Sequence, residues 1–203
     1  MTVLWRSNDP LVLASQSTTR QTLLCAAGIP FEIRTASIDE RAREAELVAR
    51  GAGPREVALD LSRAKAAKVS AVMPSRLVLG ADQVACLEGR LFGKASSSAA
   101  ARSQLVAMQG RTHELHSGCC IMRGTDILFE TVSTAWLSCR NFSAQFIETY
   151  LAQTEGSGTA ATYQIEAFGA HLFDHIEGDH WTILGLPLLP ILKFLREEGS
   201  LLS

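Results

Sequence analysis

The sequence contains no long hydrophobic run. No segment approaches the roughly 18 consecutive apolar residues that a membrane-spanning helix needs. The segment from Met1 to Pro10 has no apolar stretch of signal-peptide length. We therefore expect a cytoplasmic protein that makes no contact with a membrane.

The sequence also has no surplus of positive charge and no paired cysteine motif. Its 19 lysines and arginines are outnumbered by 21 acidic residues, so a nucleic-acid partner is not expected. The cysteines form no C-x-x-C pair, and their odd number does not describe a disulfide framework, so we expect reduced thiols. They are Cys25, Cys86, Cys119, Cys120 and Cys139.

What is present is the composition of an ordinary globular protein. With 47% hydrophobic residues in a chain of 203, a substantial core can form, and we expect one domain over residues 1–203. Apolar and alternating runs predict strands at 11–14, 31–35, 76–80, 84–87, 90–92, 113–123, 127–138 and 171–176. Helical spacing predicts helices after Ser17, from Pro54, over 99–108, after Ser143 and over 188–198, with loops at 38–40 and around Trp181. This order predicts an α/β protein with a mixed twisted sheet and helices on its faces.

The turn after the first predicted strand combines hydroxyl groups with a helix start. Ser15 and Ser17 precede the helix, and Arg20 lies one turn into it. Amide groups at a helix N-terminus attract anions, so this turn is a candidate phosphate cradle. The alternative is an ordinary serine N-cap, which is the commoner use of such a residue.

The helix that begins at Pro54 places two lysines on its apolar side. At 100° per residue, Lys65 and Lys68 fall inside the arc formed by Val57, Leu61, Ala64, Val69 and Val72. A buried ammonium needs a carboxylate or a bound anion. For Lys68 we expect the long stem to reach the surface instead.

Two acidic residues are candidates for holding Mg²⁺ or Mn²⁺. Asp82 follows an apolar strand, and Glu40 lies in a predicted loop. Hard cations in phosphoryl chemistry are held by one or two carboxylates together with substrate oxygens. Asp82 could also deprotonate the attacking water, and Lys65 and Lys94 could offset charge on the leaving group. The alternative for each of these residues is an ordinary surface charge, and Asp82 is the stronger metal candidate because it follows a buried strand.

Other motifs are rejected on spacing. Gly89 to Ala95 lacks the length and the final hydroxyl of a phosphate-binding P-loop. His113 and His116 are three residues apart in a predicted strand, so they point to opposite faces and do not make a zinc pair. His171 and His175 are also predicted on a strand, and all four histidines are interpreted as structural.

Several separated motifs together resemble the Maf-like nucleoside triphosphate pyrophosphatase family over nearly the whole chain. They are Leu13-Ala14-Ser15-Gln16-Ser17-Thr18-Thr19-Arg20, Asp39-Glu40, Ala64-Lys65-Ala66, Gly80-Ala81-Asp82-Gln83-Val84, Gly93-Lys94, Gly178-Asp179 and Gly185-Leu186-Pro187-Leu188. The resemblance implies an ITPase-like/Maf fold with an active-site cleft between two lobes. It also implies a cytoplasmic homodimer that hydrolyses a nucleoside triphosphate to a monophosphate and pyrophosphate with Mg²⁺ or Mn²⁺.

The resemblance also assigns roles to single residues. It implies that Asp82 is the catalytic proton acceptor and metal ligand, with the metal and phosphates surrounded by Ser15, Ser17, Arg20, Glu40, Lys65 and Lys94. Thr18 and Thr19 stand where the family usually has proline and arginine. The base-reading positions are Thr19, Gln83 and Glu166, and the last two resemble the branch that acts on 7-methyl-GTP. A carboxylate at Glu166 suits a purine edge with N–H donors.

Two other functions remain open from the sequence. The pocket chemistry does not separate 7-methyl-GTP from dTTP, UTP or a non-standard nucleotide such as ITP. Members of the family have also been linked to inhibition of septum formation, so a non-catalytic nucleotide-binding regulator is the alternative from another class. The presence of Glu40, Lys65, Asp82 and Lys94 favours the enzyme, because a pure binder does not need an acid that activates water.

Overall fold

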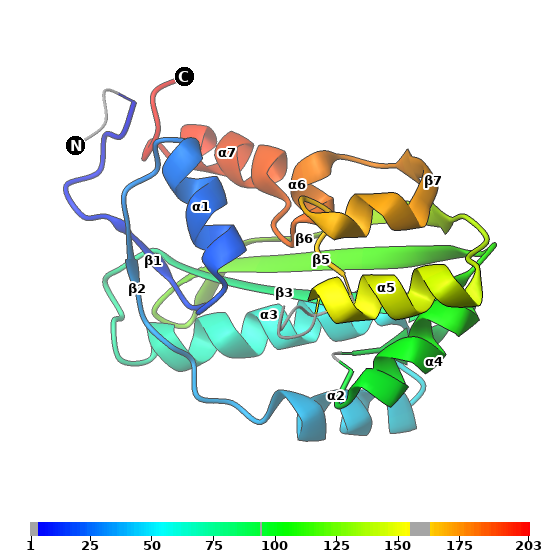
Figure 1. Cartoon of the computed structure of the whole chain (residues 1–203). Helices are drawn as coiled ribbons and strands as arrows, with labels where there is room; N and C mark the ends of the chain where they lie inside the picture. Colours follow the sequence, from blue (N-terminus) through cyan, green and yellow to red (C-terminus); the bar gives the residue numbers. More distant parts are fainter. Residues whose placement is uncertain (1–3, 94, 155–162) are drawn as a thin grey trace.

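The computed structural model describes residues 4–93, 95–154 and 163–203. In this part of the chain the strands form one open, seven-stranded mixed sheet in the order β2-β1-β3-β5-β6-β7, with β4 paired to β3 (Figure 1). The predicted α/β class with a mixed sheet is therefore confirmed. Lys94, one of the predicted catalytic residues, lies outside the described residues.

The elements follow the predicted order closely. The strands are β1 (Leu11–Leu13), β2 (Phe31–Ile33), β3 (Val78–Leu87), β4 (Arg90–Phe92), β5 (Thr112–Arg123), β6 (Asp126–Cys139) and β7 (Phe173–Glu177). The helices are α1 (Thr18–Ala26), α2 (Glu40–Ala49), α3 (Pro54–Ser70), α4 (Ser98–Met108), α5 (Ala144–Thr154), α6 (His180–Ile183) and α7 (Leu188–Glu197), with a 3₁₀ helix at Phe168–Leu172. Over the described residues, no helix has the length and apolarity required to cross a membrane.

The pairing of strand β3 with its neighbouring strands determines where the site lies. Along one edge it pairs with β5 from Val78 to Cys86. Along the other edge β1 covers only Val78 and Leu79, and β4 covers only the stretch from Ala85 to Leu87. Among the described residues, the middle of β3 therefore has no strand beside it on that edge, and Asp82 lies in this gap.

The two faces of the sheet are covered by different helices. Helix α3 packs its buried residues on one face, with α2 beside it. The opposite face is covered by α1 and α7 near the parallel strands and by α4, α5 and α6 further along. In Figure 1, α3 runs below the sheet, and α1 and α7 lie above it. Because side chains alternate along a strand, Asp82 faces the α3 side and Gln83 faces the α6 side.

Two glycines bring α3 unusually close to the sheet. A Cβ atom at Gly80 would lie 2.2 Å from the Ser62 carbonyl oxygen, and one at Gly118 would lie 2.5 Å from the Ala58 carbonyl oxygen. Both distances are shorter than any allowed contact, so only glycine fits at either position. The close approach places the middle of α3 directly against Asp82.

Five local predictions are wrong. Glu40 is the first residue of α2 rather than part of a loop, because Asp39 caps that helix through the Ala42 amide at 3.0 Å. Val72 is 78% exposed, because α3 ends at Ser70 before reaching it. His171 belongs to the 3₁₀ helix rather than to a strand.

The fourth concerns Trp181. It lies in the short helix α6 instead of a loop, since the Asp179 carboxylate caps the Thr182 amide at 2.9 Å. Other details agree with the sequence. Lys68 is exposed, and all five cysteines are free thiols. The fifth wrong prediction concerns β3: the sequence predicts two strands, at 76–80 and 84–87, whereas β3 continues through Asp82 as one strand.

Candidate active site

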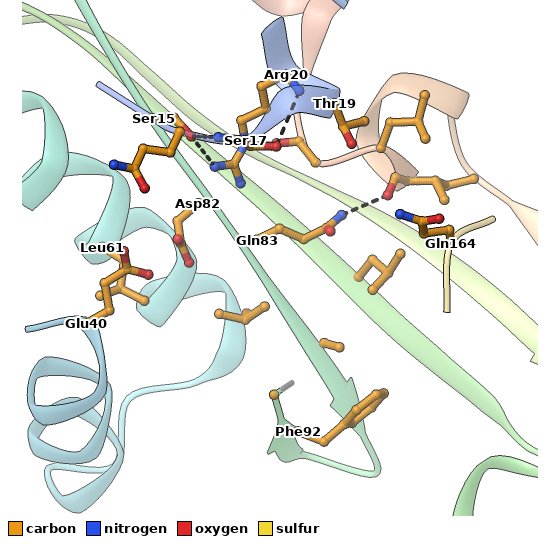
Figure 2. Close-up of a pocket in the computed structure, with 18 of the residues that line it drawn as sticks. Ser15, Ser17, Thr19, Arg20, Glu40, Leu61, Asp82, Gln83, Phe92 and Gln164 are labelled. Atoms are coloured by element: carbon orange, nitrogen blue, oxygen red, sulfur yellow. Dashed lines mark hydrogen bonds between the residues drawn. The ribbon is translucent and has the colours of Figure 1, made fainter. Parts of the chain in front are cut away.

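A cavity of about 1050 Å³ lies where β3 has no neighbouring strand. Its walls come from the turn after β1, the start of α2, the middle of α3 and of β3, the end of β4, residues 163–166 and the end of α6. Ligand pockets for small molecules are typically about 300–1,000 Å³, so this one is large enough for a nucleotide. Figure 2 shows the labelled side chains around it, with Glu40 and Asp82 on one side and Thr19 and Gln164 on the other.

The structure brings most of the predicted site residues to this one cavity. Those that line it are Ser15, Ser17, Thr19, Arg20, Glu40, Lys65, Asp82, Gln83 and Glu166. They come from segments as distant in sequence as Ser15 and Glu166, so their meeting is a result of the fold. Their individual roles stay predictions.

The charged centre of the cavity is a lysine between two carboxylates. The Lys65 Nζ atom lies 2.5 Å from Asp82 Oδ1 and 3.0 Å from Glu40 Oε1. Lys65 and Asp82 are both buried, whereas half of the Glu40 side chain is exposed. The ion partner that a buried lysine requires is therefore present.

Two opposing effects act on the pKa of the Asp82 carboxyl group. Burial raises the pKa of its carboxyl group, while the nearby Lys65 and Arg20 charges lower it. Burial likewise raises the pKa of Glu44, and the charges of Asp82 and Glu40 raise it further. Glu44 lies one helical turn after Glu40 and also lines the cavity. Three carboxylates therefore influence one another here, although within the described residues no acidic, histidine or cysteine cluster of three has metal-binding spacing.

The turn after β1 is more highly organised than a simple cap. The Ser15 hydroxyl accepts the Ser17 amide at 3.3 Å and Arg20 Nη1 at 3.0 Å, and the Ser17 hydroxyl accepts the Arg20 amide at 3.4 Å (Figure 2). Both serine oxygens act as acceptors, so both hydroxyl protons remain to be donated. This arrangement is suited to an anion.

Arg20 ties three parts of the cavity together. Its Nε donates to the Gly185 carbonyl at 2.8 Å, and its Nη1 donates to the Ala81 carbonyl at 2.9 Å. The side chain is buried, and burial lowers its pKa, an effect that Asp82 and Glu40 oppose. The guanidinium is thus fixed in place by backbone carbonyls before any ligand binds.

Gln83 connects the other side of the cavity to α6. Its Nε2 donates to Ser117 Oγ and to the Thr182 and Ile183 carbonyls, each at 3.0 Å. Gly185 follows α6 with a φ of +91°, a conformation that favours glycine. The motifs that contain Asp179 and Gly185 thus have structural roles, since Asp179 caps the start of α6 and Gly185 follows its end.

The remaining wall is apolar with one exposed acid. Phe92 at the end of β4 and Tyr163 line it, and Glu166 follows with an exposed side chain. The Tyr163 hydroxyl lies 2.6 Å from His113 Nε2 in the core beneath. This hydrogen bond anchors the segment that carries Glu166.

A known protein family matches almost the whole chain. The sequence model described as "Maf-like protein" matches residues 10–198. The chain belongs to this Maf-like family. The prediction made from the separated motifs is therefore confirmed.

Curated relatives match the Maf-like chain along nearly its full length. A protein of Nitrobacter winogradskyi is 47% identical over 98% of both chains, and one of Rhodopseudomonas palustris is 48% identical over 98% of both. Both are named "Nucleoside triphosphate pyrophosphatase". A protein of Rhizobium meliloti is 42% identical over 94% of this chain and 97% of its own, and is named "7-methyl-GTP pyrophosphatase".

Sequence reasoning missed Glu44, which lines the cavity, and Ser117, which contacts Gln83. Glu44 was overlooked, although its spacing of four from Glu40 was a usable signal once α2 is recognised as a helix. Ser117 gives no such signal, because its contact with Gln83 depends on the pairing of β3 with β5.

Proposed function

We propose that this protein hydrolyses a nucleoside triphosphate to a nucleoside monophosphate and pyrophosphate. The observation that carries the proposal is the buried Asp82–Lys65 pair, joined by Glu40, beside the hydroxyl-rich turn in one cavity. The names of relatives that cover the full chain support the same reaction.

Asp82 is the group that takes the proton from the attacking water. Its raised pKa makes it a stronger base than an ordinary aspartate, while Lys65 and Arg20 favour its ionised form. The water adds at the α-phosphorus, the bond to the bridging oxygen breaks, and pyrophosphate leaves with that oxygen.

Glu40 and Asp82 are the residues that would hold a divalent cation. Their oxygens converge closely enough for one ammonium to contact both, and two carboxylates plus phosphate oxygens form a donor set that Mg²⁺ and Mn²⁺ accept. Such a cation would supply charge stabilisation to the phosphate oxygens. Within the described residues, Glu40 and Asp82 are the two carboxylates that contact Lys65, so the site suits a cation that arrives with the triphosphate.

The positive and donor groups of the cavity bind the phosphates. Ser15 and Ser17 have hydroxyl protons to donate, and Arg20 is already positioned beside them. Lys65 offsets the charge that develops on the departing pyrophosphate. We assign the same role to Lys94 from its motif, Gly93-Lys94.

The substrate that we favour is 7-methyl-GTP. Gln83 and Glu166 resemble the corresponding branch, and a relative that is 42% identical carries that name. A cationic methylated guanine would also be attracted to the Glu166 carboxylate. The alternatives are dTTP, UTP or ITP, which require the same reaction.

We also propose that the protein is a cytoplasmic homodimer, on the ground of the family resemblance. Multi-angle light scattering of the purified chain measures its mass directly. A monomer mass at all protein concentrations would refute the dimer.

The test of the reaction is pyrophosphate release with Mg²⁺ or Mn²⁺ against dTTP, UTP, GTP, 7-methyl-GTP and ITP. We expect turnover by the wild type, a loss of at least about a hundredfold in Asp82→Asn, and no loss in Asp126→Asn, an exposed hairpin aspartate. Highest activity on 7-methyl-GTP would support the substrate proposal, and a preference for dTTP or UTP would refute it.

A different result would favour the regulator. If the wild type binds nucleotides but releases no pyrophosphate from any of them, the enzyme proposal fails. The non-catalytic regulator then becomes the better description.

A further inference from the structure

The charges that line the cavity are unbalanced for a polyphosphate ligand. In the described part of the chain, the charged residues that line it are the acids Glu40, Glu44, Asp82 and Glu166 and the cations Arg20, Arg41 and Lys65. The acids outnumber the cations, and a nucleoside triphosphate adds several negative charges of its own. A divalent cation offsets only part of this charge, so the surroundings of each cationic side chain decide what the cavity can bind.

Two of these cations are already engaged by the protein. Arg20 donates to two backbone carbonyls and to the Ser15 hydroxyl, and Lys65 lies between two carboxylates. Both side chains are buried. Arg41 differs in each respect, because it is exposed and no hydrogen bond or ion pair joins its side chain to another described residue. Arg41 can therefore offer all its N–H groups to a ligand.

The place of Arg41 in its helix is unfavourable for a cation. Asp39 caps α2 and Glu40 is its first residue, so Arg41 lies in the first turn. The helix dipole puts partial positive charge at this end, where an acid is stabilising and an arginine is not. Glu44 lies one turn further along and lines the same cavity, yet these two described residues form no ion pair. A bound anion, in contrast, would be attracted both by the guanidinium and by the helix start.

Arg41 lies at the end of the cavity that is opposite the 163–166 wall. In Figure 2, Glu40 is on the other side of Asp82 from Gln164, and Arg41 directly follows Glu40 in α2. A second hollow of about 650 Å³ lies at the start of α2, and Glu40 and Arg41 line it as well as the main cavity. With cleavage at Asp82 and the nucleoside toward Gln164, the phosphates beyond the α-phosphorus extend toward α2.

We propose that Arg41 binds the terminal phosphate of the substrate and makes the cavity selective for nucleoside triphosphates over diphosphates. The inference rests on the proposed pyrophosphatase function and adds the length of the phosphate chain that the site recognises. The terminal phosphate is part of the leaving pyrophosphate, so Arg41 also offsets charge that develops there as the bond to the α-phosphorus breaks. A diphosphate lacks this phosphate and leaves the Arg41 guanidinium without its ligand.

Matched triphosphates and diphosphates test the role of Arg41. GTP and UTP are measured as substrates, and GDP and UDP as competing inhibitors, so the comparison does not require cleavage of the diphosphates. We expect Arg41→Gln to lower kcat/KM for both triphosphates by about tenfold or more, the usual effect of losing a hydrogen bond to a charged group. The inhibition constants of the diphosphates should change much less, and Arg41→Lys should retain part of the activity. Equal effects on triphosphates and diphosphates, or no effect on either, would overturn the inference.

Arg50→Gln is the matched control. Arg50 lies exposed at the other end of α2, where it pairs with Glu46 at 3.6 Å, and it is not among the residues that line the cavity. The substitution removes the same charge from the same helix and should leave kcat/KM for GTP unchanged. Thermal unfolding detects a structural role, because Arg41→Gln removes a cation from the first turn and should not lower Tm. A loss of activity that comes with a lower Tm, or that Arg50→Gln shares, would contradict a direct contact with phosphate.

Binding of inorganic ligands separates this inference from the proposed reaction. Calorimetry with Mg²⁺ and pyrophosphate, and with Mg²⁺ and orthophosphate, requires no turnover. The wild type should bind pyrophosphate about tenfold more tightly than Arg41→Gln does, with a smaller difference for orthophosphate. A protein that releases no pyrophosphate from any nucleotide refutes the reaction, and the calorimetry still supports or overturns the role of Arg41. An active enzyme whose two forms bind pyrophosphate equally retains the reaction and loses the contact with Arg41.

Discussion

Lys65 illustrates how a single side chain reveals a site. A buried ion pair contributes little net stability, because the cost of removing both charges from water offsets their attraction. The chain nevertheless pairs Lys65 of α3 with Asp82 of β3, with Glu40 as a second carboxylate. Apolar residues in place of Lys65 and Asp82 would pack equally well. The ion pair is therefore explained by chemistry in the cavity rather than by a contribution to the stability of the core.

His113 should make the stability of the fold dependent on pH. Burial lowers its pKa from 6.5 to about 4. Between these values the unfolded chain binds a proton that the folded chain does not, so stability is full above pH 6.5 and falls toward pH 4. The loss should reach about 3 kcal/mol. Urea unfolding at a series of pH values measures it.

The control for this effect is His113→Gln, which keeps a partner for the Tyr163 hydroxyl but does not titrate. Its stability should fall less steeply over the same pH range. Parallel curves for the two proteins would refute the assignment to His113.

Individual site residues were predictable where the local sequence dictates their environment. Lys65 falls on the apolar arc of its helix, and Asp82 follows a run that must be buried, so both stand out. Ser117 was beyond reach, because a serine in a strand acquires meaning only from the register that places it opposite Gln83. The same holds for the contact between Tyr163 and His113.

At the scale of elements, the contact between α3 and the sheet sets the geometry of the cavity. Gly118→Ala should push α3 outward, because its Cβ would meet the Ala58 backbone at 2.5 Å. We expect a stability loss of about 1–3 kcal/mol and a lower kcat, since Lys65 moves with the helix. Urea unfolding and pyrophosphate release measure the two effects.

Gly53→Ser is the comparison for this variant. A Cβ at Gly53 meets no atom within 4 Å, and serine is a good N-cap for α3. It should preserve both stability and kcat. Similar losses in the two variants would show that the close approach is not the cause.

Elements with strong periodicity were found from the sequence, and weakly patterned ones were not. Helix α2 buries only Leu47, so its sequence has no apolar stripe, and the sequence predicts a loop where the helix begins. The end of α3 was overestimated because Val72 continues the spacing after the helix has stopped. Periodicity reports which side would be buried, and tertiary packing decides where the element ends.

For the whole molecule, the proposed cation and nucleotide should stabilise the fold only together. Two carboxylates give a weak site on their own, so Mg²⁺ alone should raise Tm little. Mg²⁺ with a nucleotide bridged by a methylene between the α- and β-phosphorus should raise it by several degrees. Differential scanning calorimetry, with EDTA as the control, measures the shifts. An equal increase with Mg²⁺ alone would contradict the expectation that the cation arrives with the triphosphate.

The gap in the edge of β3 lets two neighbouring residues line one cavity. Asp82 and Gln83 are neighbours in sequence, yet they face opposite sides of the sheet and open onto the same cavity. If the proposed roles hold, a single peptide bond separates the choice of nucleotide from its cleavage. Substitutions on the Gln83 side could then give descendants of this protein new substrates, while the Asp82 side keeps its chemistry unchanged.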